Sequence, residues 1–345
     1  MVRIAILGVG FMGLTHYKAY EQIDGAEVVT IASRDPDKAA GRVAGVAGNV
    51  GGALPDRLPM DRIHGTTDLH EPIAREDIDV IDICLATPMH AEYAIAALEA
   101  GKHVVCEKPL AATVDAAEPI VEAAERAERA GKGYFMPAMC MRFWPAWQWL
   151  KEAVDDGRFG GVRSAAFVRN TCPPGGWFRD GALSGGAAMD LHIHDTDYIH
   201  WLFGTPRAVT SRGYVGVTGK IDHIASFYHY DHVPLVYGEG SWTFDRGSGF
   251  ICHATVNFEH ATAHFDLSGE GSGLKLASEG RLEPVDCSGY GHADGWEGQL
   301  RYLIECVRRG ERPGVVDAAA ALESMRTVEA ECRSAITGQS VTRSG

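Results

Sequence analysis

The chain has 345 residues, enough for two domains of ordinary size. Hydrophobic residues make up 46% and charged residues 23%, which excludes wholesale disorder. A formal net charge of −14 argues against nucleic acid and anionic membrane as partners, although a local cluster of donors can still hold a small anion. The eight cysteines form no Cys-x-x-Cys pair and no apolar run is long enough to span a bilayer, so we expect a soluble, reduced cytoplasmic protein.

The first third of the chain alternates short apolar runs with helical patterns. Expected strands are residues 4–7, 27–32, 80–85, 103–106 and 134–138, and expected helices are 11–22, 91–100 and 113–130. Because parallel strands are joined by helical crossovers, this rhythm predicts a doubly wound parallel sheet of the Rossmann type. Asp35 before Pro36 is typical of an N-cap followed by proline in the first helical turn.

The pattern changes from about residue 147. A helix over 147–156 precedes segments of period-two hydrophobicity at 162–169, 208–214, 225–230, 233–242, 250–258 and 261–267. Helical patterns return at 299–309 and 317–337. We therefore predict an α/β protein with a dinucleotide-binding domain over 1–130. A second α/β domain over 131–345 is expected to have a largely antiparallel open sheet.

The string GVGFMG at residues 8–13 fits the G-x-G-x-x-G pattern of dinucleotide-binding proteins. It follows a buried strand and opens a helix, which is the setting that the mechanism requires. Gly8 allows the tight turn, Gly10 lets a diphosphate approach the backbone, and Gly13 allows close packing. With Phe11 and Met12, these glycines are the expected diphosphate-binding residues, because the N–H groups at the helix start face the anion. The alternative is three glycines in an ordinary turn.

In dinucleotide-binding domains, the residues at the end of the second strand determine the preference between NAD and NADP. An acidic residue there would bind the ribose 2′-hydroxyl of NAD, but the sequence has Ser33-Arg34. Arg34 can pair with a 2′-phosphate and Ser33 can donate to it, so the sequence favours NADP, with NAD as the second choice. Arg34 as a solvated surface residue is the alternative.

Three longer motifs are more specific: ATPMH at 86–90, AGKHVVCEKPL at 100–110 and GGAAMDLHIHDTD at 185–197. In this order they closely resemble the Gfo/Idh/MocA oxidoreductases, the family of glucose–fructose oxidoreductase and inositol dehydrogenase. The resemblance covers nearly the whole chain and is strongest over residues 1–204. It aligns Asp190, His194 and Asp197 with the family's Asp-x-x-x-His-x-x-Asp segment. It implies that Lys108, Asp190 and His194 are catalytic.

The residues themselves suit these roles. A lysine at the carboxyl end of a parallel strand projects into the ligand crevice, where Lys108 can stabilise an alkoxide-like oxygen and bind substrate. Glu107 beside it can orient it or fix its charge; a purely structural ion pair is the alternative. On a helix, Asp190 and His194 share one face, and Asp197 joins that side. Histidine titrates near neutral pH, which suits general acid–base work.

Other residues are weaker candidates. Thr87, Pro88 and His90 are expected to line the nicotinamide ribose. Arg142, Trp144, Trp177 and Phe178 are expected either to form substrate walls or to pack within the domain. A zinc site built on His192, His194 and Asp190 is a further alternative, but the helical spacing accounts for these residues without a metal, so none is predicted. His192 and Asp195 are expected to be structural.

Together these features predict an NADP-preferring dehydrogenase or reductase of a sugar, cyclitol or related polyol. The resemblance leaves two alternatives: a redox-mechanism glycosidase that retains its nucleotide, and a non-catalytic nucleotide-sensing regulator. It also implies that the domain over 131–345 binds substrate and forms oligomers, either a homodimer or a homotetramer.

Overall fold

The computed structural model describes residues 1–48, 52–267 and 273–343. The chain divides into two compact units, Met1–Cys140 with Asp294–Leu322 and Met141–Ala293 with Glu323–Gly345. This division differs from the expected boundary at residue 130, because helix α9 (Gly295–Arg309) returns to pack against α1 and β1 of the first unit. None of the helices in these ranges is both long and apolar enough to cross a lipid bilayer.

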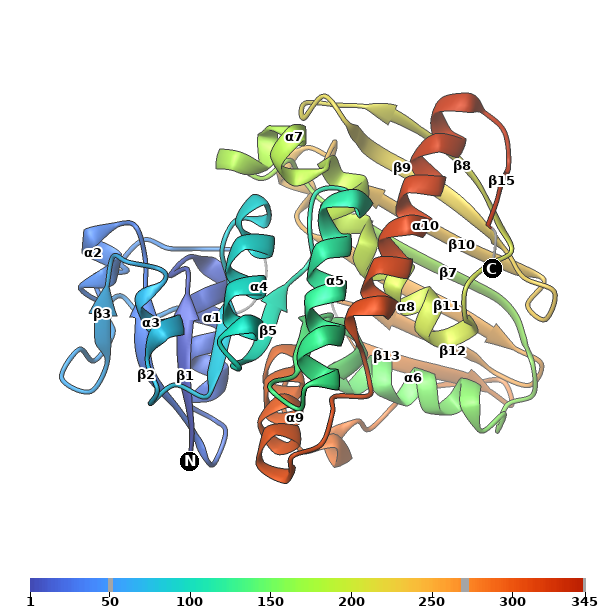
Figure 1. Ribbon diagram of the computed structural model, residues 1–345. Coiled ribbons are helices and arrows are strands. Elements are labelled where there is room, and N and C mark those ends of the chain that lie inside the picture. Colours follow the sequence, from blue (N-terminus) through green and yellow to red (C-terminus); the bar gives the residue numbers. More distant parts are fainter. Residues whose placement is uncertain (49–51, 268–272, 344–345) are drawn as a thin grey trace. The chain divides into compact units, whose positions relative to one another are not determined.

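The first unit is built on a six-stranded parallel sheet with the order β3-β2-β1-β4-β5-β6 (Figure 1). Its strands are β1 (Val2–Leu7), β2 (Ala26–Ala32), β3 (His64–Thr66), β4 (Val80–Ile83), β5 (His103–Glu107) and β6 (Phe135–Ala138). Its other helices are α1 (Phe11–Tyr20), α2 (Pro36–Ala39), α3 (Glu71–Ala74), α4 (His90–Glu99) and α5 (Val114–Arg129). The strand order reverses between β1 and β4, so ligands are expected at the carboxyl ends of these two strands.

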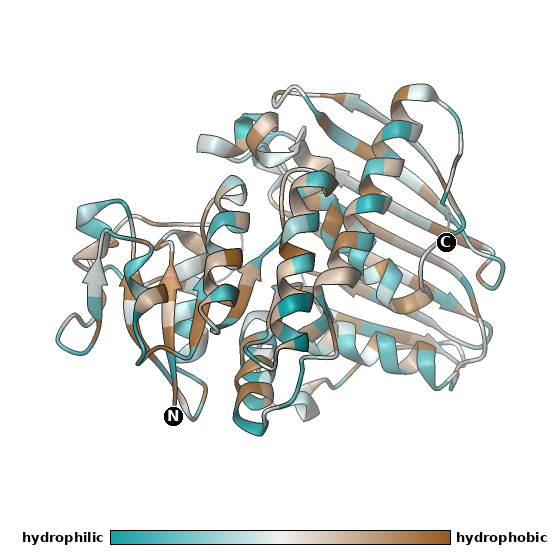
Figure 2. Ribbon diagram, viewed as in Figure 1, coloured by the Kyte–Doolittle hydropathy of each residue, from teal (hydrophilic) through white to brown (hydrophobic). Residues whose placement is uncertain are grey.

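Sequence patterns explain these elements. Apart from Arg3, strand β1 is a run of apolar side chains that are buried almost completely, and brown predominates along it in Figure 2. Helix α5 is amphipathic, and the Thr113 hydroxyl caps its first turn by accepting from the backbone N–H of Ala116. Asp35 caps α2 as predicted, accepting from the N–H groups of Asp37 and Lys38.

The second unit is built on a nine-stranded sheet with the order β14-β13-β12-β11-β7-β10-β9-β8-β15. Its strands are β7 (Val162–Asn170), β8 (Ala208–Val215), β9 (Ile221–His229), β10 (Leu235–Ser241), β11 (Ile251–Phe258), β12 (Thr262–Asp266), β13 (Gly273–Ser278), β14 (Arg281–Pro284) and β15 (Val341–Thr342). Its helices are α6 (Pro145–Asp155), α7 (Gly181–Ser184) and α8 (Ile193–Phe203), and α10 (Ala318–Thr337) begins in the first unit and continues here. Within the described strands of this second sheet, only β7 and β10 pair in parallel; the largely antiparallel pairing confirms the predicted fold class.

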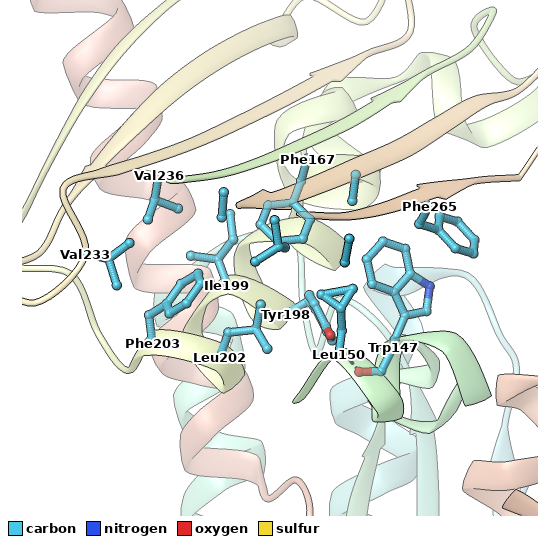
Figure 3. Packing of buried hydrophobic residues seen from close by; sticks show 14 of the residues in the cluster. Trp147, Leu150, Phe167, Tyr198, Ile199, Leu202, Phe203, Val233, Val236 and Phe265 are labelled. Carbon is cyan, nitrogen blue, oxygen red and sulfur yellow. Dashed lines mark hydrogen bonds between the residues drawn. The ribbon is translucent and has the colours of Figure 1, made fainter. Parts of the chain in front are cut away.

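The core of the second unit lies between one face of this sheet and helices α6 and α8. Trp147 of α6 and Tyr198 of α8 meet edge to face at 4.8 Å, and Phe167 of β7 packs on both rings (Figure 3). The Tyr198 hydroxyl donates to the backbone carbonyl of Trp147 at 2.7 Å, so its one polar atom is satisfied. The helices that carry the candidate residues are thus packed firmly on the sheet.

Candidate active site

The glycine loop joins β1 to α1 in the first unit. Gly8 has a φ of +98°, and a methyl group there would overlap the carbonyl oxygen of Cys84, so both its turn and its packing require glycine. A methyl group on Gly13 would overlap the carbonyl oxygen of Gly8. In contrast, a methyl group on Gly10 would meet nothing within 4 Å. Gly10 is therefore the point of the loop that another molecule can approach.

Helix α1 starts at this open point. Gly10 is its N-cap and provides no side-chain hydrogen bond, and the first turn has no acidic residue. The first N–H groups of a helix lack partners within it and carry partial positive charge. A loop that leaves these N–H groups accessible suits a cofactor diphosphate. The predicted diphosphate-binding residues, Gly8, Gly10, Phe11, Met12 and Gly13, all belong to this loop and the first turn of α1.

Ser33 and Arg34 follow strand β2. Ser33 is buried, and its hydroxyl accepts a hydrogen bond from the N–H of Asp35 at 3.3 Å. Arg34 is exposed, and the described part of the chain offers it no ion pair or side-chain hydrogen bond. The guanidinium is thus available to an anion from solution.

Glu107 and Lys108 lie at the carboxyl end of β5. The Glu107 side chain accepts a hydrogen bond from the backbone N–H of Lys108 at 3.2 Å, and Lys108 is half-buried. His90 was predicted to line the ribose, but its Nδ1 and Nε2 lie 2.9 and 3.0 Å from the backbone oxygens of Pro109 and Leu85. His90 therefore ties together the loops that follow β4 and β5, and burial lowers its pKa. Thr87 is buried and Pro88 exposed at the start of the same loop as His90.

A buried polar cluster lies beneath these strand ends and was not predicted. His16 of α1 is completely buried; its Nδ1 lies 2.9 Å from Asp82 and its Nε2 lies 3.2 Å from Glu107. The Cys84 thiol and the Gln299 amide also contact the imidazole, each at 3.3 Å. One signal in the sequence could have revealed the cluster: a histidine on α1 and an aspartate on β4 occupy inward-facing positions of otherwise apolar elements. Buried charges need partners, so the two residues could have been expected to meet.

The second unit carries the other candidate residues in the segment 185–197. Gly185 and Gly186 both have a positive φ, near 78°, and they precede a single π-helical turn, Ala188–His192, that leads into α8. A regular α-helix was predicted here. Asp190 lies in the π turn and is 7% exposed, whereas His194 lies in the first turn of α8 and is half-buried. Such π turns are frequent at functional sites, because they change the direction of the side chains they carry.

Two buried ion pairs hold this segment on the sheet. Arg142 binds Asp197 through two hydrogen bonds of 2.8 and 2.7 Å, and Arg169 of β7 binds Asp195 through bonds of 2.8 and 3.1 Å. Ser324 adds a hydrogen bond to Asp197 at 3.1 Å. Two nitrogens of the Arg142 guanidinium are thus directed at Asp197. Arg142 was expected either to form a substrate wall or to pack within the domain; its side chain is buried and packs within the second unit.

His192 forms a third attachment. Its Nε2 lies 3.2 Å from Glu331 of α10 and 3.0 Å from the hydroxyl of Tyr228. Burial opposes both charges, but their mutual attraction raises the pKa of His192 and lowers that of Glu331. The imidazole occupies a slot left by Gly238 and Gly240 on β10; a methyl group on Gly240 would lie 2.7 Å from the Cβ of His192. His192 is therefore structural, as expected, and two of the glycines of this region serve to admit it.

Two aromatic candidates also lie in the second unit. Trp177 and Phe178 stack with ring centroids 4.0 Å apart, and Phe178 meets Trp242 edge to face at 5.9 Å. Trp177 is half-buried, so part of its surface is open to solvent. Among the described residues, the one group of His, Cys, Asp and Glu donors close enough to share a metal is His16, Asp82 and Cys84, not the predicted alternative around His192.

Comparison with known families and proteins gives consistent matches. Residues 2–132 match an oxidoreductase family model with an NAD-binding Rossmann fold, and residues 147–269 match the GFO/IDH/MocA C-terminal domain. Inositol 2-dehydrogenase 3 of Saccharopolyspora erythraea is 34% identical over 203 residues, which cover 58% of this chain and 53% of that protein. The match thus spans about half the length of this relative.

Two further proteins match over greater lengths. D-xylose 1-dehydrogenase [NADP(+)] of Haloarcula marismortui is 25% identical over 90% of this chain and 85% of its own. The crystal structure of an oxidoreductase domain protein from Kribbella flavida superposes with a TM-score of 0.84 at 24% identity, covering 100% of both chains. This structural likeness supports the fold.

Proposed function

Because the chain belongs to the Gfo/Idh/MocA oxidoreductase family, we propose that it transfers hydride between a nicotinamide cofactor and a hydroxyl or carbonyl carbon of a sugar, cyclitol or related polyol. The observation that carries the proposal is the glycine loop of the first unit, in which Gly8 and Gly13 are closely packed and Gly10 is open. Dinucleotide-binding loops use this arrangement, with packed first and third glycines and an open second one. Sugar and inositol dehydrogenases among the relatives support the substrate class.

We propose that Lys108, Asp190 and His194 carry out the chemical step. When bound, the nicotinamide supplies the hydride acceptor for oxidation of an alcohol. His194 takes the hydroxyl proton while the carbon gives up its hydride, so the alcohol becomes a carbonyl. The Lys108 ammonium donates a hydrogen bond to the same oxygen and stabilises its developing negative charge. Asp190 binds a substrate hydroxyl or orients the imidazole, and reduction follows the reverse path.

We propose that NADP is the preferred cofactor. The exposed guanidinium of Arg34 after β2 supports this choice, because a 2′-phosphate would give it an anionic partner. The name of the Haloarcula relative also includes NADP(+), whereas the family model is described as NAD-binding. Glu107, Thr87 and Pro88 complete the proposed cofactor set, and Trp177 completes the substrate set. His90 and Arg142, which were also expected in these sets, instead support them by holding the loop after β5 and the segment of Asp197 in place.

One experiment tests the reaction class. The purified protein is mixed with NADP(H) or NAD(H) and a panel of aldoses, cyclitols, keto-sugars and diols, and nicotinamide absorbance is followed in both directions. We expect turnover with at least one polyol or keto-sugar and a higher kcat/KM with NADP(H). Turnover of aryl glycosides by protein that retains its nucleotide would instead indicate the glycosidase. Tight cofactor binding with no turnover across the panel would indicate the regulator.

We also propose a cytoplasmic homodimer or homotetramer that associates through the open face of the second unit's sheet. Phe227 and Leu235 lie on this face and are 45% and 49% exposed, and Phe227 contacts the Tyr237 ring at 5.5 Å. All eight cysteines are free thiols, which suits a reducing compartment. Light scattering should give a multiple of the 37.2 kDa chain mass, and Phe227→Glu should reduce it to the monomer.

A further inference from the structure

The buried cluster of His16, Asp82 and Glu107 has a defined charge. Both imidazole nitrogens face a carboxylate oxygen, Nδ1 toward Asp82 at 2.9 Å and Nε2 toward Glu107 at 3.2 Å. A neutral imidazole can donate from only one nitrogen, so the doubly protonated imidazolium suits this pair of neighbours best, with Nδ1 hydrogen-bonded to Asp82 and Nε2 in ion-pair range of Glu107. Burial alone would lower the pKa of His16, but attraction to Asp82 and the hydrogen bonds outweigh it and raise the pKa well above its usual value.

The neighbours of the cluster contribute no further charge, apart from Lys108. Burial raises the pKa of the Tyr20 phenol and of the Cys84 and Cys106 thiols, so these groups are neutral. Burial also lowers the pKa of His90, and the Gln299 amide is uncharged. One imidazolium and two carboxylates therefore sum to one negative charge, with the Lys108 ammonium beside it.

The cluster lies where the cofactor's reactive end is expected. Asp82 and Glu107 belong to β4 and β5, on the opposite side of β1 from β2 and Arg34. The backbone of Cys84, next to Asp82, packs directly under Gly8 of the glycine loop. In a Rossmann sheet the two halves each hold one mononucleotide, so β4 and β5 serve the nicotinamide half if β2 serves the adenosine half.

We propose that the net charge of the His16–Asp82–Glu107 cluster sets the protein's relative affinity for the oxidised and the reduced nicotinamide cofactor. The oxidised ring carries one positive charge that it loses on accepting hydride. A buried negative charge below it therefore stabilises the oxidised form, and His16 limits this preference by offsetting one of the two carboxylates. This proposal rests on the proposed cofactor use, and it identifies His16 as a residue that acts on the cofactor through charge without touching it.

The test measures the dissociation constants of NADP+ and NADPH by calorimetry at about pH 7, where the raised pKa of His16 keeps its imidazole charged. His16→Gln removes the cation and should raise the ratio Kd(NADPH)/Kd(NADP+) about tenfold, the effect of a unit charge over roughly 10 Å. The double variant His16→Gln/Asp82→Asn again has one net negative charge in the cluster, so its ratio should return to that of the wild type.

Gln299→Glu provides an independent variant that keeps His16. Gln299 is completely buried, its Nε2 lies 3.3 Å from the imidazole and its Oε1 has no partner, so a carboxylate there faces a cation. It adds one negative charge, and the ratio should again rise. If all of these proteins bind both cofactors with the wild-type ratio, the cluster only stabilises the fold and the proposal is wrong. If the wild type binds neither cofactor, the proposed function itself fails.

Discussion

The two units use buried charge in different ways. In the first, the carboxylates of Asp82 on β4 and Glu107 on β5 converge on the His16 imidazole of α1, beneath the carboxyl ends of the strands. In the second, Asp195, Asp197 and His192 of a single segment each reach a different partner, so the charges fasten one helix to its surroundings. We infer that the first unit gathers charge beside the proposed cofactor site, whereas the second uses charge to hold the segment that carries Asp190 and His194, the proposed catalytic residues.

The largest expected effect tests whether the two units serve one reaction. Lys108→Met in the first unit should lower kcat about 1,000-fold, because the developing alkoxide loses its donor. His194→Asn in the second should lower kcat about 100- to 1,000-fold through loss of the base. If both act in the same step, the double variant should be little worse than Lys108→Met alone. Multiplied losses would show that the two residues contribute independently rather than as a unit. Unchanged turnover in Lys108→Met would overturn the assignment of that residue.

The next prediction concerns the ion pairs of the second unit. Arg142→Met should lower the free energy of unfolding by about 3–5 kcal/mol, because Asp197 would stay buried without its cation. Adding Asp197→Leu should restore most of the loss, since an apolar pair has no charge to bury. Urea unfolding measures both. A small loss for Arg142→Met, or a double variant as unstable as the single one, would show that the pair does not fasten the segment.

The sequence was sufficient to predict the first unit's parallel sheet and the strand and helix on either side of the glycine loop, because apolar runs and glycine spacing are local signals. The same holds for the Asp35 cap. The sequence missed the short edge strand β3 (His64–Thr66). It could not predict the π turn at Ala188–His192, since that turn depends on where His192 finds room. The slot on β10 and the partner Glu331 come from segments about 40 to 140 residues away. His16 was missed for the same reason: its partners lie on three other elements.

A smaller effect is expected where the second unit admits His192. Gly240→Ala should lower the free energy of unfolding by about 1–3 kcal/mol, because the new methyl group would lie 2.7 Å from the His192 Cβ and displace the imidazole. Gly161→Ala is the matched control, since a methyl group there would meet nothing within 4 Å. Thermal unfolding compares the two. Equal stability of both variants would mean that the glycine at 240 is not needed for His192.

The smallest effect lies in the first unit and concerns an exposed charge. Arg34→Ala should weaken NADP+ binding about tenfold and leave NAD+ binding unchanged, because only NADP+ has the 2′-phosphate that the guanidinium would pair with. Arg129→Ala removes another exposed arginine of this unit and controls for the loss of general positive charge. Arg34 is exposed to solvent and salt, whereas the cluster at His16 is buried. Raising the ionic strength should therefore reduce the loss of NADP+ affinity in Arg34→Ala, but it should leave the changed ratio of dissociation constants in His16→Gln almost unaltered. Equal losses for both nucleotides in Arg34→Ala would assign Arg34 to the adenine ring or the diphosphate and remove the argument for NADP.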